Sequence, residues 1–108
     1  MKSEPIVVIM TAGDRNEARR IAEMLVSQNL AACVQLLPGI DSIYRWKGEI
    51  NREQEVLMLA KTHREKFADL ERAVRAIHSY ETPEIIALGI EEGSEPYLQW
   101  LTNLMEGS

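Results

Sequence analysis

The chain contains four short apolar segments, and each would be apolar on both faces if it formed a strand. The segments are IVVIM (6–10), AACVQLL (31–37), EVLMLAKT (55–62) and EIIALGI (84–90). Side chains of a strand alternate between its two faces, and two helices can cover one face of a four-stranded sheet. An exposed apolar sheet face of that size usually marks an interface. We therefore predict that the protein assembles with copies of itself through the second face.

Capping-box spacings indicate two helices between these strands. Asp14 lies three residues before Glu17, and Thr62 lies three residues before Glu65. In such a pair each side chain covers the other residue's free backbone N–H. The first pair predicts an amphipathic helix over 14–28, and the second predicts a helix that ends near residue 80.

The segment 30–62 predicts a long β-hairpin that turns at Lys47-Gly48. Pro38-Gly39 interrupts its first arm, and because proline lacks a donor N–H it predicts a bulge or a sheet edge. The arms (42–46 and 49–53) outrun a compact domain, so we expect them to brace neighbouring subunits. In the second arm two sets of side chains alternate, and the sequence leaves open which of them forms the interface: Leu57 and Leu59, or Val56, Met58 and Ala60.

A last helix opens at Ser94, with Pro96 in its first turn. The complete order is β-α-β-β-α-β followed by this helix. We therefore predict a single α+β domain over residues 1–108, with the split βαβ arrangement called ferredoxin-like.

Composition limits the compartments and partners that we expect. The chain has 108 residues, of which 45% are hydrophobic and 27% are charged, as in one globular domain. Its net charge of -5 argues against a nucleic-acid partner. One cysteine, Cys33, permits no intrachain disulfide and fits a reducing cytoplasm. The apolar segment 6–10 is too short for a signal-peptide core or a membrane span, so we expect no membrane partner.

Four blocks of this sequence resemble the CutA family of divalent-cation tolerance proteins. The blocks are LAACVQLLPGIDSIYRWKGEI (30–50), EVLMLAKT (55–62), HSYETPEIIAL (78–88) and YLQWL (97–101). The match covers almost the whole chain, and four ordered blocks at the family's spacing are far more specific than any single motif. The resemblance implies a ferredoxin-like domain, a tight homotrimer in which the sheets pack together, a cytoplasmic setting, and a link to copper and other divalent metals.

The resemblance also implies a metal ligand at His78. The family's copper-binding pattern has a cysteine at the end of the first strand and two adjacent histidines, the second followed by a proline. Here these positions hold Met10, Ile77, His78 and Ser79. We expect Cu(II) or another divalent cation to bind weakly at His78, with no cofactor required. The residues alone also allow a structural interpretation, in which His78 is protonated and stabilised by the dipole at a helix C-terminus.

The remaining candidate residues favour binding over catalysis. Glu84 precedes a buried strand and is a candidate salt-bridge partner for Lys61. The sequence has no nucleophile–base pair, P-loop, CxxC or HExxH motif, so we predict that the protein is not an enzyme. The alternative function is a small-molecule sensor or signalling trimer like the PII proteins, by fold analogy alone. Its candidate inter-subunit cleft contains Lys61, Tyr80 and Glu84.

Two further residues have simple structural interpretations. We expect His63 to lie at the surface, at the start of the second helix. We expect Cys33 to be a small hydrophobic residue of the core, as a free thiol with apolar neighbours usually is.

Overall fold

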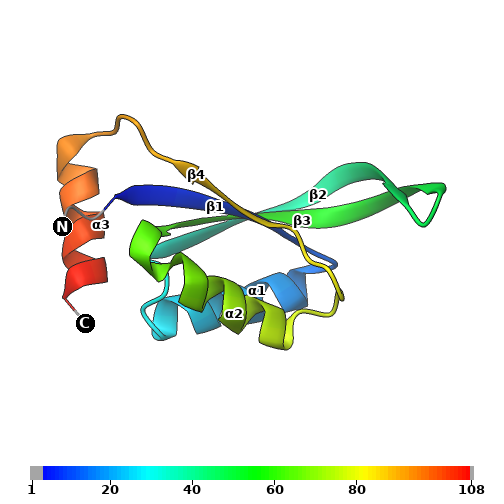
Figure 1. Cartoon of the computed structure of the whole chain (residues 1–108), viewed down its shortest axis with the longest axis horizontal. Helices are drawn as coiled ribbons and strands as arrows, with labels where there is room; N and C mark the ends of the chain where they lie inside the picture. The colour runs from blue at the N-terminus through cyan, green and yellow to red at the C-terminus, as the bar shows by residue number, and fades with distance from the viewer. Residues whose placement is uncertain (1–3, 108) are drawn as a thin grey trace.

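The computed structural model describes residues 4–107, and the predicted order of elements is confirmed in them (Figure 1). The elements are β1 (Pro5–Ala12), α1 (Arg15–Ser27), β2 (Cys33–Trp46), β3 (Glu49–His63), the 3-10 turn η1 (Arg64–Lys66), α2 (Phe67–Ile77), β4 (Ile85–Gly89) and α3 (Glu95–Glu106). The strands form one antiparallel sheet in the order β2-β3-β1-β4. This βαββαβ arrangement is the predicted ferredoxin-like α+β fold.

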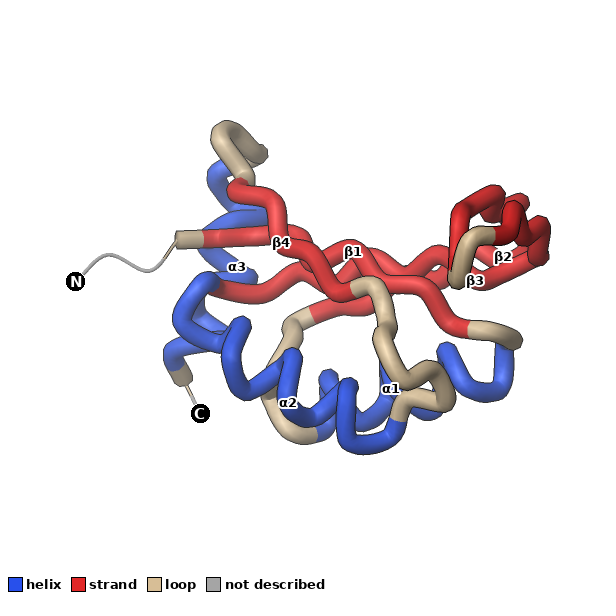
Figure 2. The backbone as a smooth tube through the Cα atoms, turned by 45° about the vertical axis from the view of Figure 1, so that its right-hand side comes forward, coloured by secondary structure: helices blue, strands red, loops and turns tan. Residues whose placement is uncertain are grey.

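The helices α1 and α2 lie on one face of the sheet, and the core is enclosed between them and the central strands (Figures 1 and 2). The central strands contribute alternate residues to this core: Ile6, Val8 and Met10 from β1, and Val56, Met58 and Ala60 from β3. Leu70 and Val74 of α2 are fully buried against them. Val56, Met58 and Ala60 therefore belong to the core, and Leu57 and Leu59 point to the opposite face.

That opposite face carries seven apolar side chains, and we call it the open face. Its members come from all four strands: Val7, Ile9, Leu37, Leu57, Leu59, Ile86 and Leu88. Leu37, Ile86 and Leu88 are between 50% and 57% exposed, and the other four are partly exposed. Within residues 4–107, helices cover the other face of the sheet, and α3 stands across one end of it (Figure 1).

The hairpin of β2 and β3 projects beyond the helices as a two-stranded arm (Figure 1). Its turn is at Lys47-Gly48, as predicted, and both residues have positive φ (51° and 81°), the form that matches the twist of paired strands. The register of β2 against β3 shifts between Leu37 and Ile40. β2 is also an edge strand, so one of its sides has no neighbouring strand. Pro38 lacks an N–H, and at an edge this costs no hydrogen bond to a strand on the free side.

The predicted capping box at Thr62 and Glu65 is wrong, and the box at Asp14 and Glu17 forms only in part, because Glu17 accepts the Gly13 N–H instead of the Asp14 N–H. Asp14 does cap α1, since its Oδ1 accepts the Glu17 N–H at 2.8 Å. Thr62, however, lies inside β3, where its hydroxyl donates to the Leu30 carbonyl at 2.8 Å. α2 begins only at Phe67, after η1. The strand continues through Thr62 because Ile6 of β1 pairs with it.

The predicted environments of His63 and Cys33 are also wrong. His63 is fully buried at the end of β3, and its Nε2 lies 3.1 Å from Thr102 Oγ1 of α3. This contact, with buried Leu101 and Met105, holds α3 against the end of the sheet. Cys33 is partly exposed at the start of β2 rather than in the core. None of the helices formed by residues 4–107 has the length and apolar character needed to cross a membrane.

Candidate functional site

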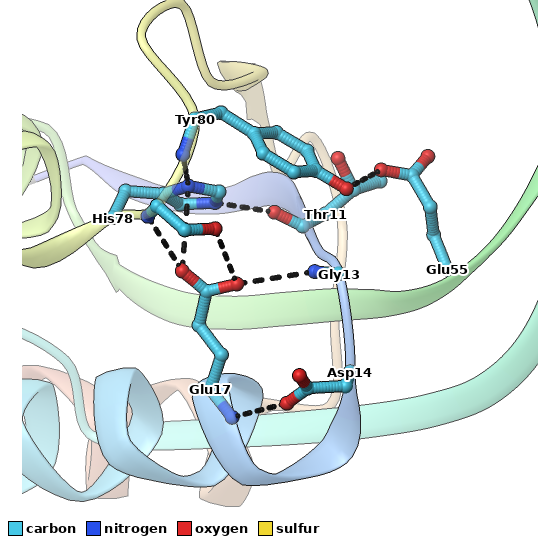
Figure 3. Close-up of polar contacts among 8 residues, drawn as sticks. Thr11, Gly13, Asp14, Glu17, Glu55, His78 and Tyr80 are labelled. Atoms are coloured by element: carbon cyan, nitrogen blue, oxygen red, sulfur yellow. Dashed lines mark hydrogen bonds and ion pairs between the residues drawn. The ribbon is translucent and has the colours of Figure 1, made fainter.

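The corner between α2 and β4 (residues 78–84) packs against the end of β1, and His78 is its first residue. His78 ends α2 by adopting extended backbone angles (φ -72°, ψ 142°). Its side chain is fully buried. Nε2 lies 2.8 Å from the carbonyl oxygen of Thr11, and Nδ1 lies 3.0 Å from the backbone nitrogen of Tyr80 (Figure 3).

These two partners assign the protonation state of the His78 ring. The Thr11 carbonyl can only accept, so Nε2 carries the hydrogen. The Tyr80 N–H can only donate, so Nδ1 presents its lone pair. The imidazole is therefore neutral, and both of its nitrogen atoms are in use. The position at the end of a helix was predicted, but the protonated state that the helix dipole would stabilise does not match these hydrogen bonds.

Glu17 of α1 fills the space below His78. Its carboxylate accepts the Gly13 N–H at 3.2 Å, the Ser79 N–H at 2.6 Å and the Ser79 hydroxyl at 3.0 Å. Oε2 is 3.7 Å from His78 Nδ1. Burial raises the pKa of Glu17, but the hydrogen bonds from Ser79 and Gly13 bring this pKa below its ordinary value. Glu17 is therefore an ionised, hydrogen-bonded carboxylate at neutral pH.

Tyr80 extends the network to the base of the hairpin arm. Its hydroxyl donates to Glu55 Oε2 at 2.7 Å (Figure 3). Burial and this bond to Glu55 raise the pKa of Tyr80 well above its ordinary value. The Tyr80 ring packs beside the turn at Gly13, where a Cβ atom would lie 3.4 Å from its hydroxyl. The hydrogen bonds thus run from α1 through the corner to β3.

Lys61 and Glu84 do not meet within one chain. Lys61 lies in β3, and its ammonium donates to the Gln35 side chain. In the register of the sheet, Lys61 pairs with Val7 of β1, and Val7 pairs on its other side with Leu88 of β4. Glu84 comes four residues before Leu88, which places it about 13 Å away along the strand direction. The predicted Lys61–Glu84 salt bridge is therefore not formed in the chain, and a cleft that contains both residues needs two chains.

The residues at the corner do not fit the copper site that the family resemblance implies. Met10 lies on the helix-facing side of β1 and is buried in the core. Ile77, at the second ligand position, has no donor atom. Both His78 nitrogens are hydrogen-bonded. In the part of the chain that the structure describes, no group of three or more His, Cys, Asp or Glu residues is arranged to hold a metal ion.

Comparisons with known proteins agree with the fold. The family model described as CutA1 divalent ion tolerance protein matches residues 6–104. A divalent-cation tolerance protein CutA from Thermus thermophilus is 50% identical over 95 residues, which is 88% of this chain and 92% of that protein. A human protein CutA is 45% identical over 97 residues. The match covers 90% of this chain but 54% of the human protein, so the chain spans about half of that relative's length.

Solved structures give the same result. CutA1 from Oryza sativa superimposes with a TM-score of 0.92 at 39% identity, over 97% of this chain and 96% of that one. A structure described as the periplasmic divalent cation tolerance protein CutA, from Archaeoglobus fulgidus, has a TM-score of 0.91 at 41% identity, over 94% and 99% of the two chains. By the family model and by this identity along nearly its whole length, the chain belongs to the CutA1 divalent ion tolerance family.

Proposed function

We propose that the protein acts in divalent-cation tolerance as a homotrimer that binds rather than catalyses. The open face is the observation that carries this proposal. A contiguous group of seven apolar side chains on one side of a sheet, three of them at least half exposed, is typical of an interaction surface. A stable interface buries about 800 Å² per partner, a demand that a sheet face can meet. Among possible assemblies we favour the trimer because the family resemblance implies it.

The hairpin arm supports the same proposal. It exposes large apolar side chains beyond the part of the sheet that the helices cover: Ile43, Tyr44, Trp46 and Ile50. Because the arm projects away from its own domain, these apolar side chains are better placed to contact a neighbouring subunit than their own. We therefore expect it to brace the assembly, as the sequence predicted.

Metal binding is then a property of the assembly. A divalent ion held at ordinary coordination number needs several donor atoms. The described residues of one chain do not group three such side chains, so we expect a divalent-cation site to combine donors from different subunits.

A cytoplasmic setting is part of the proposal. It is supported by the single, partly exposed thiol of Cys33, which a reducing compartment would preserve. Cell fractionation tests this setting against the periplasmic description that the archaeal relative carries.

A ligand cleft between subunits is the second candidate function. Lys61 lies far from the corner that contains Tyr80 and Glu84, so packing between chains would be needed to bring them together. Calorimetric titration of chelator-washed protein with copper, zinc and nucleotides separates the two candidates. Nucleotide binding that Lys61→Ala abolishes would favour the sensor function, whereas divalent-cation binding without nucleotide binding would favour the tolerance function.

A pair of matched variants tests the interface. Leu88 on the open face is 51% exposed in the single chain, and Val26 on the outer side of α1 is 46% exposed. A glutamate at either site is compatible with a folded monomer. We expect Leu88→Glu to dissociate the assembly, because it would bury an unpaired charge there, and Val26→Glu to leave the assembly intact. Equal masses for the two variants by light scattering would contradict the proposed interface.

A further inference from the structure

The polar groups that surround Glu17 at the corner are hydrogen-bond donors. Gly13 contributes an N–H from the turn after β1, and Ser79 contributes an N–H and a hydroxyl from the corner. Converging backbone N–H groups of this kind make a site for anions, because their positive ends point inward. A metal cation at the same position would face these positive ends and lose the favourable contacts that the carboxylate has.

His78 reinforces this arrangement from above. Its Nδ1 lone pair, the atom that a metal would need, accepts the Tyr80 N–H at 3.0 Å. Its Nε2–H donates to the Thr11 carbonyl at 2.8 Å. Coordination through either nitrogen would leave a part-buried backbone group without its partner, in addition to displacing the ring. The ring is thus occupied as a link between β1 and the corner.

Ser79 supplies two of the three donors that contact the Glu17 carboxylate. A proline at this position would have neither an N–H nor a hydroxyl to offer. The 2.6 Å bond from the Ser79 N–H and the 3.0 Å bond from its hydroxyl therefore require a residue such as serine. They close the corner over the carboxylate of Glu17.

From these contacts we propose that the α2–β4 corner of this protein is a carboxylate-binding cage, occupied by its own Glu17 and closed by Ser79, and that it does not take Cu(II). His78 is a positioning residue of this cage. The proposal does not depend on the trimer, since all of the contacts lie within one chain.

The copper arm of the test uses the wild-type protein and Cu(II) itself. Long-range ¹⁵N–¹H correlation of the ring should show the neutral Nε2–H tautomer of His78, and the ring signals should not be the first that substoichiometric Cu(II) broadens. His78→Ala should change the copper dissociation constant by less than about threefold, whereas the loss of a ligand costs at least about tenfold. Selective broadening at His78, or a tenfold loss in the variant, would overturn the proposal.

The second part of the test measures anion binding. It uses Glu17→Ala, which removes the carboxylate from the cage, and Glu23→Ala as its control. Glu23 is an exposed carboxylate on the same helix. Sodium formate, compared with sodium chloride at equal ionic strength, should raise the melting temperature of Glu17→Ala in a saturable manner and leave the wild type and Glu23→Ala unchanged. No selective rise would contradict the cage. If Glu17→Ala does not fold, Ser79→Ala decides this arm: its loss of the hydroxyl donor should shift the Glu17 carboxylate ¹³C signal, and an unchanged signal would contradict the cage.

Discussion

Glu17 joins two segments that are 62 residues apart in the chain, because the two donors of Ser79 both end on its carboxylate. Glutamine at this position keeps the shape but replaces one acceptor oxygen with an NH₂ group, which would oppose the Ser79 or Gly13 donors. We expect Glu17→Gln to lower the free energy of unfolding by about 1–3 kcal/mol at neutral pH, the cost of an unsatisfied buried donor. Urea unfolding measures this difference in the free energy of unfolding. A value near zero would show that the corner rearranges and that the ionised carboxylate contributes no stability.

The same residue predicts a pH dependence. The pKa of Glu17 is lower in the folded protein than its ordinary value, so the folded state binds this proton less readily than the unfolded state does. The stabilisation is therefore complete above about pH 4.3, the unfolded value, and is lost as the pH falls through the lower folded pKa. The stability difference between wild type and Glu17→Gln should shrink over that acidic range. A difference that stays constant with pH would contradict the ionised state.

At the scale of single residues the sequence predicted local contacts and missed distant ones. The spacing of Asp14 and Glu17 predicted the cap of α1, which forms. That spacing carries no information about Ser79, which reaches Glu17 only after the chain has crossed the sheet. His63 was misplaced for a related reason. A histidine next to charged residues resembles a surface position, and the Thr102 hydroxyl that lies against it is 39 residues away.

At the scale of elements, the turn of the hairpin arm gives a direct test of backbone geometry. Lys47 and Gly48 both have positive φ, which costs a residue with a Cβ atom roughly 1–2 kcal/mol. Gly48→Ala should therefore destabilise the arm by about 1–2 kcal/mol. Lys47→Asn should be neutral or stabilising, because asparagine favours this turn. Thermal unfolding of both variants measures the effects, and an equal loss of stability in the two would argue against this turn.

The elements themselves were predictable because their patterns are local. Both helices on the covered face show apolar stripes, and the turn residues separate the strands. The start of α2 was not predictable from the capping-box spacing of Thr62 and Glu65, because the same spacing occurs where a strand ends. Thr62 remains in β3 because it pairs with Ile6 of β1, a contact that the local sequence does not show.

At the scale of the whole molecule, the sequence predicted two apolar sheet faces but not their roles. Alternation separates Leu57 and Leu59 from Met58, yet only the packing of α1 and α2 shows that Met58 belongs to the core. A charge at Met58 would therefore unfold the domain, whereas a charge on the open face would separate subunits. Residue spacing along the chain does not indicate which face of the sheet the helices cover, because the tertiary packing of α1 and α2 decides it.

Association through the open face should also make the protein resistant to heat. Folding linked to assembly is favoured by mass action, so the melting temperature should rise with protein concentration. Differential scanning calorimetry over a wide concentration range checks this expectation. An ordinary melting temperature that does not change with concentration would mean that burial of the open face contributes nothing to stability.

The mass of the protein in solution tests the central claim, that the open face is an interface between copies of the chain. Sedimentation equilibrium at micromolar concentration should give a single species of about 37 kDa, three times the 12.3 kDa of the chain. A species of 12.3 kDa at that concentration would show that the open face stays exposed, and would contradict the assembly proposed for this protein.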